Sequence, residues 1–317
     1  MFALVSSVSM AAVVLMDIVM TATGKRTYSR PSQMLAVSNL LDPVFGIVVW
    51  LPLWLAHDHT EVPVECIWMA IISGALLGLI ANGIYFSLMM SEAKDATEIS
   101  LYDGATPVAV SILLAIGFGL GFPNPEHIRW WQWMGVILTS VGLALMPLLG
   151  GITKMLAKHR VALIGFMITQ ALYMILFDRA CRMATNPMGS ELGAFLALYP
   201  YFWVGMAAGI LPIFLPKEWR EFRSQLPTIL NHWRRIGLAE GFATIAFAAQ
   251  VASFGGEHVA VADAICGTFP LMVFLGGILL RKSFGFSEEI FPREERPWAK
   301  ATIIVFVLAT ITLGIWR

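Results

Sequence analysis

The dominant pattern along the 317-residue chain is a series of long apolar segments joined by short polar connections. About 20 mostly apolar residues in a helix cross the roughly 30 Å hydrocarbon core of a bilayer, and lipid offers no partner for unpaired backbone amides. We therefore predict an all-α membrane protein, with its first apolar segment retained as a span. The ten predicted transmembrane helices are 3–22, 34–56, 66–90, 98–121, 131–150, 161–179, 190–215, 236–254, 259–280 and 298–316.

The connection after the seventh predicted span has a pattern of its own. Apolar and basic residues interleave there at helical spacing: Trp219, Phe222 and Leu226, with Lys217, Arg220 and Arg223 between them. This pattern fits a short interfacial helix beside an anionic leaflet. An ordinary charged loop is the alternative.

The composition agrees with a bilayer environment and narrows the classes of function. Apolar residues make up 58% of the chain, charged residues 13%, and the mean hydropathy is +0.74; soluble domains have about 25% charged residues. The net charge of zero gives no indication of a nucleic-acid partner. Cys66, Cys181 and Cys266 lie apart without a CxxC spacing, so we expect small buried side chains, with no metal site and no cofactor.

The distribution of Lys and Arg predicts an orientation. All but four of the 21 lie in the connections after odd-numbered spans, and the four others are Arg129, Arg179, Arg182 and Arg317. This bias places the odd-numbered connections in the cytoplasm and both termini on the opposite side.

An internal repeat relates the two halves of the chain. Gly74-xxx-Gly78 in the third span matches Gly237-xxx-Gly241 in the eighth. At the same offset Gly104 matches Gly267 and Pro107 matches Pro270, while at nearby offsets Asp17 matches Asp178 and Pro43 matches Pro200. Pairs of small residues separated by three others also allow close helix packing, as at Gly205-xxx-Gly209.

The repeat predicts two units, residues 1–150 and 151–317, with five spans each. Because five is odd, the second unit is inverted relative to the first. Inverted repeats are typical of secondary transporters, whose sites lie near the midplane between the units. Prolines within the spans are interpreted either as hinges for alternating access or as static kinks.

These features resemble the drug/metabolite transporter superfamily, in its ten-span EamA-like branch. The resemblance rests on residues 95–100 leading through Gly104-Ala105-Thr106-Pro107-Val108, on Gly267-Thr268-Phe269-Pro270-Leu271, and on Trp131-Gln132-Trp133-Met134-Gly135. It implies transport of small organic solutes driven by ion or solute gradients, and it implies cytoplasmic termini, against the Lys and Arg bias. It also implies a multi-pass protein of the cell (inner or plasma) membrane.

Acidic residues within the spans are the main candidates for a site, because a central Asp costs about 2.5–3.5 kcal/mol to insert. The symmetric Asp17 and Asp178 fit structural or coupling roles, and Asp178 has Arg179 and Arg182 close enough for a local pair. Asp103, Asp263 and Glu240 break the repeat and are preferred as substrate-binding residues, with Glu240 inside the Gly237-xxx-Gly241 stretch. The remaining substrate-binding candidates are Asp42 (nearest a span centre), Glu98, Tyr102 and Tyr85, while Pro107 and Pro270 join the structural or coupling group.

Each acid could instead be satisfied at a helix end. The aromatic residues could form a cage for an ammonium group, and Tyr199 to Trp203 surround Pro200, but aromatics also fill cores and girdle interfaces.

The balance of acids over bases in the spans favours a cationic or zwitterionic solute, with proton–solute competition for one carboxylate as a coupling hypothesis. We therefore predict a secondary active transporter of a small-molecule solute, working in the lipid bilayer as a monomer or homodimer. No catalytic motif such as HExxH or GxSxG is present, so we do not expect an enzyme. A membrane-embedded enzyme and a non-transporting membrane subunit are the alternatives.

Overall fold

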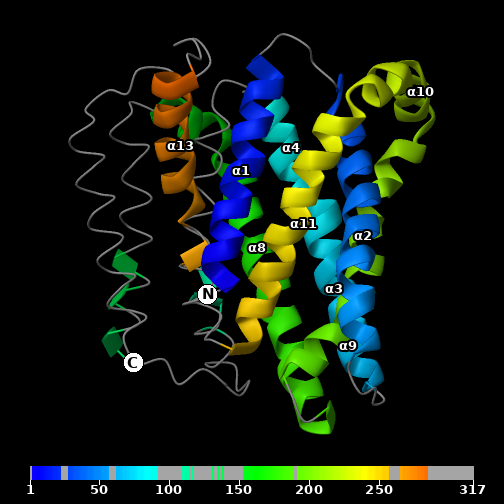
Figure 1. The fold of residues 1–317 in the computed structure, drawn as a ribbon, viewed down its shortest axis with the longest axis vertical. Coiled ribbons are helices and arrows are strands. Elements are labelled where there is room, and N and C mark those ends of the chain that lie inside the picture. The colour runs from blue at the N-terminus through cyan, green and yellow to red at the C-terminus, as the bar shows by residue number, and fades with distance from the viewer. Residues whose placement is uncertain are drawn as a thin grey trace.

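The computed structural model describes residues 2–22, 28–56, 62–91, 153–188, 191–256 and 268–284, with 109–110, 112–113, 116, 130–131, 134–135, 137–138 and 265–266. Within these residues the protein is helical and contains no strand. The long helices stand side by side and run alternately up and down (Figure 1). The predicted all-α class is confirmed.

The helices form two groups along the chain. The first comprises α1 (Phe2–Ala22), α2 (Pro31–Leu55), α3 (Val64–Ala75), the π-helical segment η1 (Leu76–Ala81) and α4 (Asn82–Ser91). The second comprises α8 (Thr153–Met188), α9 (Glu191–Met206), the 3-10 helical segment η3 (Ala207–Phe214), α10 (Pro216–Asn231), α11 (Trp233–Gly256) and α13 (Phe269–Phe284).

In the described part of the chain, four helical segments are long and apolar enough to cross a membrane: Pro31–Pro52, Val64–Leu88, His159–Thr185 and Gly193–Phe214. They coincide with the spans predicted at 34–56, 66–90, 161–179 and 190–215. Helix α1 contains a shorter apolar stretch, Val5–Met16, and α11 and α13 are helices that overlap the spans predicted at 236–254 and 259–280. The predictions at 98–121, 131–150 and 298–316 lie mostly or wholly outside the described residues.

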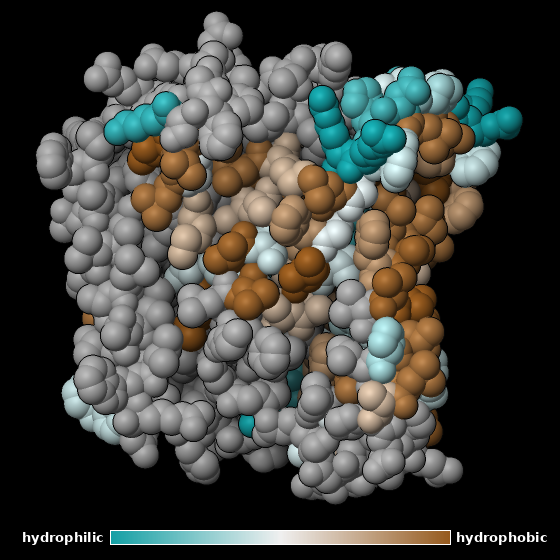
Figure 2. Space-filling view, viewed as in Figure 1, coloured by the Kyte–Doolittle hydropathy of each residue, from teal (hydrophilic) through white to brown (hydrophobic). Residues whose placement is uncertain are grey.

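Helix α2 has its polar face inward and its apolar face outward. Leu40, Val44 and Val48 are 57%, 53% and 66% exposed, whereas Ser38 and Asp42 are buried. Figure 2 shows the same arrangement, with apolar surface over α2 and the centre of the visible face and polar surface at the upper edge over α10. Apolar side chains facing outward suit a helix that faces lipid, so the described helices indicate a membrane protein.

Helices α3 and α9 cross at glycines. A Cβ on Gly74 would lie 1.9 Å from the carbonyl oxygen of Phe202, and one on Gly205 would lie 2.0 Å from that of Ile71. Neither helix could approach the other this closely with any side chain at these positions, so the packing role predicted for both glycine pairs is confirmed.

The matching pair in α11 behaves differently. A Cβ on Gly237 would meet only Phe45, at 3.9 Å, and one on Gly241 would meet nothing within 4 Å among the described residues. Within the described residues no close contact is seen at these two glycines, so the close-contact stretch around Glu240 stays a prediction. Small residues permit close approach, but they do not enforce it.

Beyond the glycine crossing, both helices leave α geometry, as η1 and η3. The buried Asn39 of α2 lies against this region, where its Nδ2 donates to the carbonyl oxygens of Leu35 (2.8 Å) and Gly78 (3.3 Å). A π-helical segment interrupts the regular ladder of backbone hydrogen bonds and is frequent at functional sites. Asn39 thus supplies a side-chain donor to a carbonyl within the π segment.

The segment after the seventh predicted span forms the helix α10. Of the two alternatives for this segment, a short helix and an ordinary charged loop, the structure shows the helix. It is fastened to the start of α2, because Arg30 forms ion pairs with Glu218 and with Glu221 (2.6 Å), and the Ser32 hydroxyl donates to Glu218. We call these four residues the α10 clamp. Lys217, Arg220 and Arg223 remain exposed at the polar edge of the molecule.

Acidification is expected to release the α10 clamp. The hydrogen bond from Ser32, followed by that from Arg30, lowers the pKa of the Glu218 carboxyl below its ordinary value of 4.5, against an opposing effect of burial. The stabilisation that Glu218 gives to the α10 clamp is therefore fully present above pH 4.5. It is lost as the pH falls through the lowered pKa of this carboxyl. Amide hydrogen exchange in α10, corrected for intrinsic rates, should rise in that window. Glu218→Gln should raise the exchange rate of the α10 amides several-fold at neutral pH. Glu65→Gln, at an exposed position on α3, is the control and should leave that rate unchanged. Equal exchange in both variants would contradict the clamp.

Candidate functional site

Two carboxyl groups meet in the interior, between α2 and α11. Asp42 is 0% exposed and Glu240 is 8% exposed. The Ser38 hydroxyl lies between them, with its Oγ 2.9 Å from Glu240 Oε2 and 3.4 Å from Asp42 Oδ2. The two carboxyls lie close enough to repel each other when both are ionised. We call Asp42 and Glu240 the carboxyl pair.

The carboxyl pair has few hydrogen-bond donors. Thr244 Oγ1 lies 3.3 Å from Asp42 Oδ1 and 2.9 Å from the backbone oxygen of Glu240, but a hydroxyl has only one proton to donate. Ser38 has the same limit and faces both carboxyls. An ionised carboxylate can only accept, so a direct hydrogen bond between two carboxyls requires a shared proton. The pair therefore needs a proton or a cationic group to complete it.

Neither carboxyl of the pair contacts a cationic side chain among the described residues. Asp178 provides the contrast, because both of its oxygens accept from Arg182 Nε at 2.8–2.9 Å. The predicted local pair at Asp178 is thereby confirmed. A buried acid with its own arginine is structurally satisfied, whereas Asp42 and Glu240 have no such partner in the described part of the chain.

Two unpartnered donors lie on α9 next to the carboxyl pair. The Tyr199 hydroxyl and the Trp203 indole N–H belong to side chains that are 2% and 3% exposed, and neither has a hydrogen-bond partner within the described chain. The Tyr199 hydroxyl lies beside the Trp203 indole N–H, without hydrogen-bond geometry, and within electrostatic range of Asp42. Trp203 Nε1 approaches α2 at Gly46, 2.7 Å from where a Cβ would stand. We call these two groups the donor pair.

Helical periodicity explains how these residues come together. Ser38, Asp42 and Gly46 are spaced by four and share one face of α2. Tyr199 and Trp203 share a face of α9 in the same way, and Glu240 and Thr244 share a face of α11. The sequence singled out both acids and the aromatic segment, but not Ser38 or Thr244. In the sequence, a hydroxyl residue stands four positions from each acid, and this spacing could have indicated Ser38 and Thr244.

The other predicted site residues fall elsewhere. Tyr85 makes ring contacts with Phe86 and Phe166, in the apolar core. Pro270 stands in the first turn of α13, where a missing N–H costs no helical hydrogen bond, so it is not a kink within that helix. The predictions for Glu98, Tyr102, Asp103, Pro107 and Asp263, and for the side chain of Asp17, lie outside the described residues.

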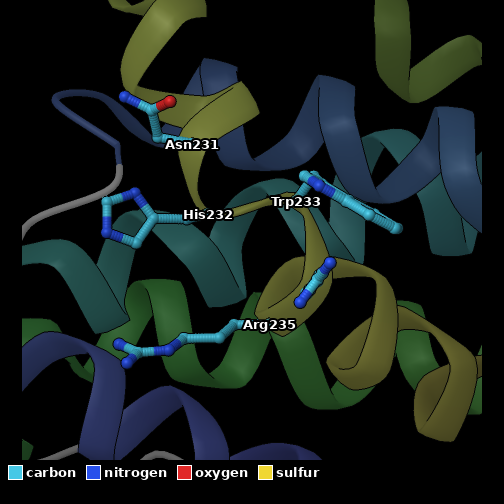
Figure 3. A pocket seen from close by; sticks show the side chains of 5 residues that line it. Asn231, His232, Trp233 and Arg235 are labelled. Atoms are coloured by element: carbon cyan, nitrogen blue, oxygen red, sulfur yellow. The ribbon is translucent and has the colours of Figure 1, made fainter.

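A second polar feature is a surface pocket of about 440 Å³ at the junction of α10 and α11. Asn231, His232, Trp233, Arg234 and Arg235 line it. His232 and Arg235 reach toward the same side of the chain, while Trp233 points to the other (Figure 3). Its basic residues make it electrostatically opposite to the carboxyl pair, which lies further along α11.

Metal chemistry finds no support among the described residues, where no group of three or more His, Cys, Asp or Glu could hold an ion. Cys66, Cys181 and Cys266 form no disulfide within the described residues and are buried, as expected from their apolar surroundings.

Comparison with known proteins adds information on the fold. No protein family and no curated protein matches this sequence. A protein of known crystal structure is similar to this chain with a TM-score of 0.60, over 98% of this chain and 96% of the other, at 16% sequence identity. At this identity the similarity concerns the fold alone, and it extends over nearly the whole chain.

Proposed function

We propose that this chain is a secondary active transporter of a small organic solute, such as a metabolite, an amine or an amino-acid-like compound. The observation that carries the proposal is the buried carboxyl pair, which has no cationic partner among the described residues. Such acids are costly to keep in a membrane protein, and they mark substrate or proton pathways.

The same proposal includes ten spans in two inverted five-helix units, 1–150 and 151–317. The packing of the described helices supports this symmetry. Helix α3 packs against α8 and α9, and its repeat counterpart α11 packs against α1 and α2. Exchange of the two units converts one set of neighbours into the other, as expected for an inverted repeat.

The position of the carboxyl pair supports alternating access. Asp42 belongs to the first proposed unit and Glu240 to the second, so rocking of one unit against the other would change the separation of the two carboxyls. A separated pair would expose each carboxyl to solute or proton. Competition between a proton and the solute for the same carboxyls then couples the two movements.

The resemblance to the EamA-like branch of the drug/metabolite transporter superfamily agrees with this function. We accordingly propose a multi-pass protein of the inner or plasma membrane that works without a cofactor, as a monomer or homodimer.

Flux into proteoliposomes tests the function directly. Purified protein should accumulate a labelled solute from a panel of amines, amino acids and other metabolites, and an imposed pH gradient should change the initial rate. A rate that ignores the pH gradient would contradict proton coupling. Chemical conversion of a panel compound would favour a membrane-embedded enzyme, and neither flux nor conversion would favour a non-transporting subunit.

A further inference from the structure

The Tyr199 hydroxyl and the Trp203 indole N–H make no hydrogen bond within the described residues. An unpaired buried donor usually destabilises a protein, because it loses its hydrogen bonds to water and gains none in return. Tyr173 shows how this core satisfies a tyrosine, since its hydroxyl donates to Gln250 Oε1 at 3.1 Å. Tyr199 and Trp203 are equally buried and have no such acceptor among the residues that the structure describes. Two neighbouring donors without acceptors indicate a group that is bound there in another state of the protein.

The donor pair and the carboxyl pair lie along the same face of α2. Asp42 of the carboxyl pair lies on this face, and Gly46, four residues later, contacts the indole of Trp203 from the donor pair. One helical turn is about 5.4 Å, which is the scale of a small organic molecule. Gly46 has no side chain in this interval, and a Cβ there would lie 2.7 Å from Trp203 Nε1 and 2.8 Å from its Cε2. The glycine therefore lets the Trp203 indole pack directly against α2, one helical turn from Asp42.

The two pairs have complementary chemical requirements. The carboxyl pair accepts hydrogen bonds and needs positive charge or a proton. The donor pair offers an O–H and an N–H and needs an oxygen acceptor. A single solute with an ammonium group and an oxygen acceptor about one helical turn apart would satisfy all four groups.

We propose that the carboxyl pair binds the ammonium group of an amino-acid-like solute, and that Tyr199 and Trp203 bind its carboxyl or carbonyl oxygen. This proposal rests on the transport function above and specifies its substrate class. A simple amine satisfies only the carboxyl pair, and an N-acylated acid satisfies only the donor pair. The site thus discriminates by requiring both groups, because a bound solute that lacks one leaves buried polar groups unpaired.

Binding to the purified protein tests the proposal with three matched sets of probes: neutral amino acids, their decarboxylated amines and their N-acetyl derivatives. At least one amino acid should raise the melting temperature. Its amine and its N-acetyl derivative should each bind about 10- to 100-fold more weakly, since each loses a charge-assisted hydrogen bond. An amine that binds as tightly as its parent amino acid would overturn the proposal and favour an aromatic cage for a cation.

Two tyrosine variants provide the matched control. Tyr199→Phe removes an unpaired hydroxyl, so the unliganded protein should be as stable as wild type or more stable, while affinity for the amino acid falls about tenfold or more. Tyr173→Phe leaves Gln250 with one donor fewer, so it should lower the melting temperature and leave affinity unchanged. Unchanged affinity in Tyr199→Phe would overturn the assigned role of the donor pair.

The failure of this inference is distinguishable from failure of the transport function. If amino acids do not bind but another solute of the flux panel is transported, the substrate assignment is wrong and the transport function stands. If no compound is transported by protein that retains its wild-type melting temperature, both are wrong.

Discussion

The substitution Gly74→Ala is expected to destabilise the protein by about 3 kcal/mol, at the upper end of the usual range for overpacking. The new methyl group would lie 1.9 Å from the carbonyl oxygen of Phe202 and 2.9 Å from the amide nitrogen of Met206. Both are backbone atoms, so no side-chain rotation can relieve the contact. The α3–α9 crossing would have to open and lose packing along its length. Gly205→Ala, on the α9 side of the same crossing, should destabilise the protein by a similar amount. Its methyl group would lie 2.0 Å from the carbonyl oxygen of Ile71.

Gly241→Ala is the matched control, because it adds the same methyl group in a helix where nothing lies within 4 Å among the described residues. It should be neutral or stabilising by up to about 1 kcal/mol, since alanine favours helix more than glycine. Thermal unfolding in detergent micelles would measure both. Equal melting temperatures for Gly74→Ala and Gly241→Ala would show that α3 and α9 do not cross at the described distance.

The substitutions Asp42→Asn and Glu240→Gln are expected to abolish the response of flux to a pH gradient. Each removes one carboxyl from the site where proton and solute are proposed to compete. Solute affinity should also fall about 10- to 100-fold, the usual size of a lost hydrogen bond to a charged group. Flux into proteoliposomes at matched protein density, with and without the gradient, measures both effects.

The thermal stability of these two variants should not fall with their solute affinity. Removing a carboxyl that has no cationic partner relieves a buried charge, so Asp42→Asn and Glu240→Gln should melt at the wild-type temperature or above. Asp178→Asn is the control: it breaks the pair with Arg182, so it should lower the melting temperature and retain the response to a pH gradient. If Asp42→Asn kept the response to the gradient, the carboxyl pair would not be the coupling site.

The α10 segment and the two glycine pairs show what kind of information the sequence carries. The interleaving of basic and apolar residues after Pro216 depends on local spacing alone, and a helix formed there. The glycine pairs at Gly74 and Gly237 have the same local pattern, but only the first makes a close crossing in the described chain. Whether a small residue is used for close packing depends on which helix lies opposite. The local spacing of residues carries no information about that neighbour.

The carboxyl pair illustrates the same limit. The cost of an acid in a membrane span singled out both Asp42 and Glu240, but nothing in the sequence joined them. Each acid has a hydroxyl partner on the opposite helix, 202 positions away in the chain. In a bilayer, both the protein core and the lipid accept apolar side chains, so hydropathy alone only weakly specifies the face that a helix turns inward.

By itself, the sequence determined the helical class, four of the spans and the acids that need a reason to be buried, because these follow from the length and hydropathy of single segments. Only the tertiary structure decided that Asp42 meets Glu240, and that Tyr199 and Trp203 lie beside the carboxyl pair without acceptors among the described residues. The physical reason is that these facts depend on how each helix is rotated about its axis, and that rotation is set by packing between helices distant in the chain.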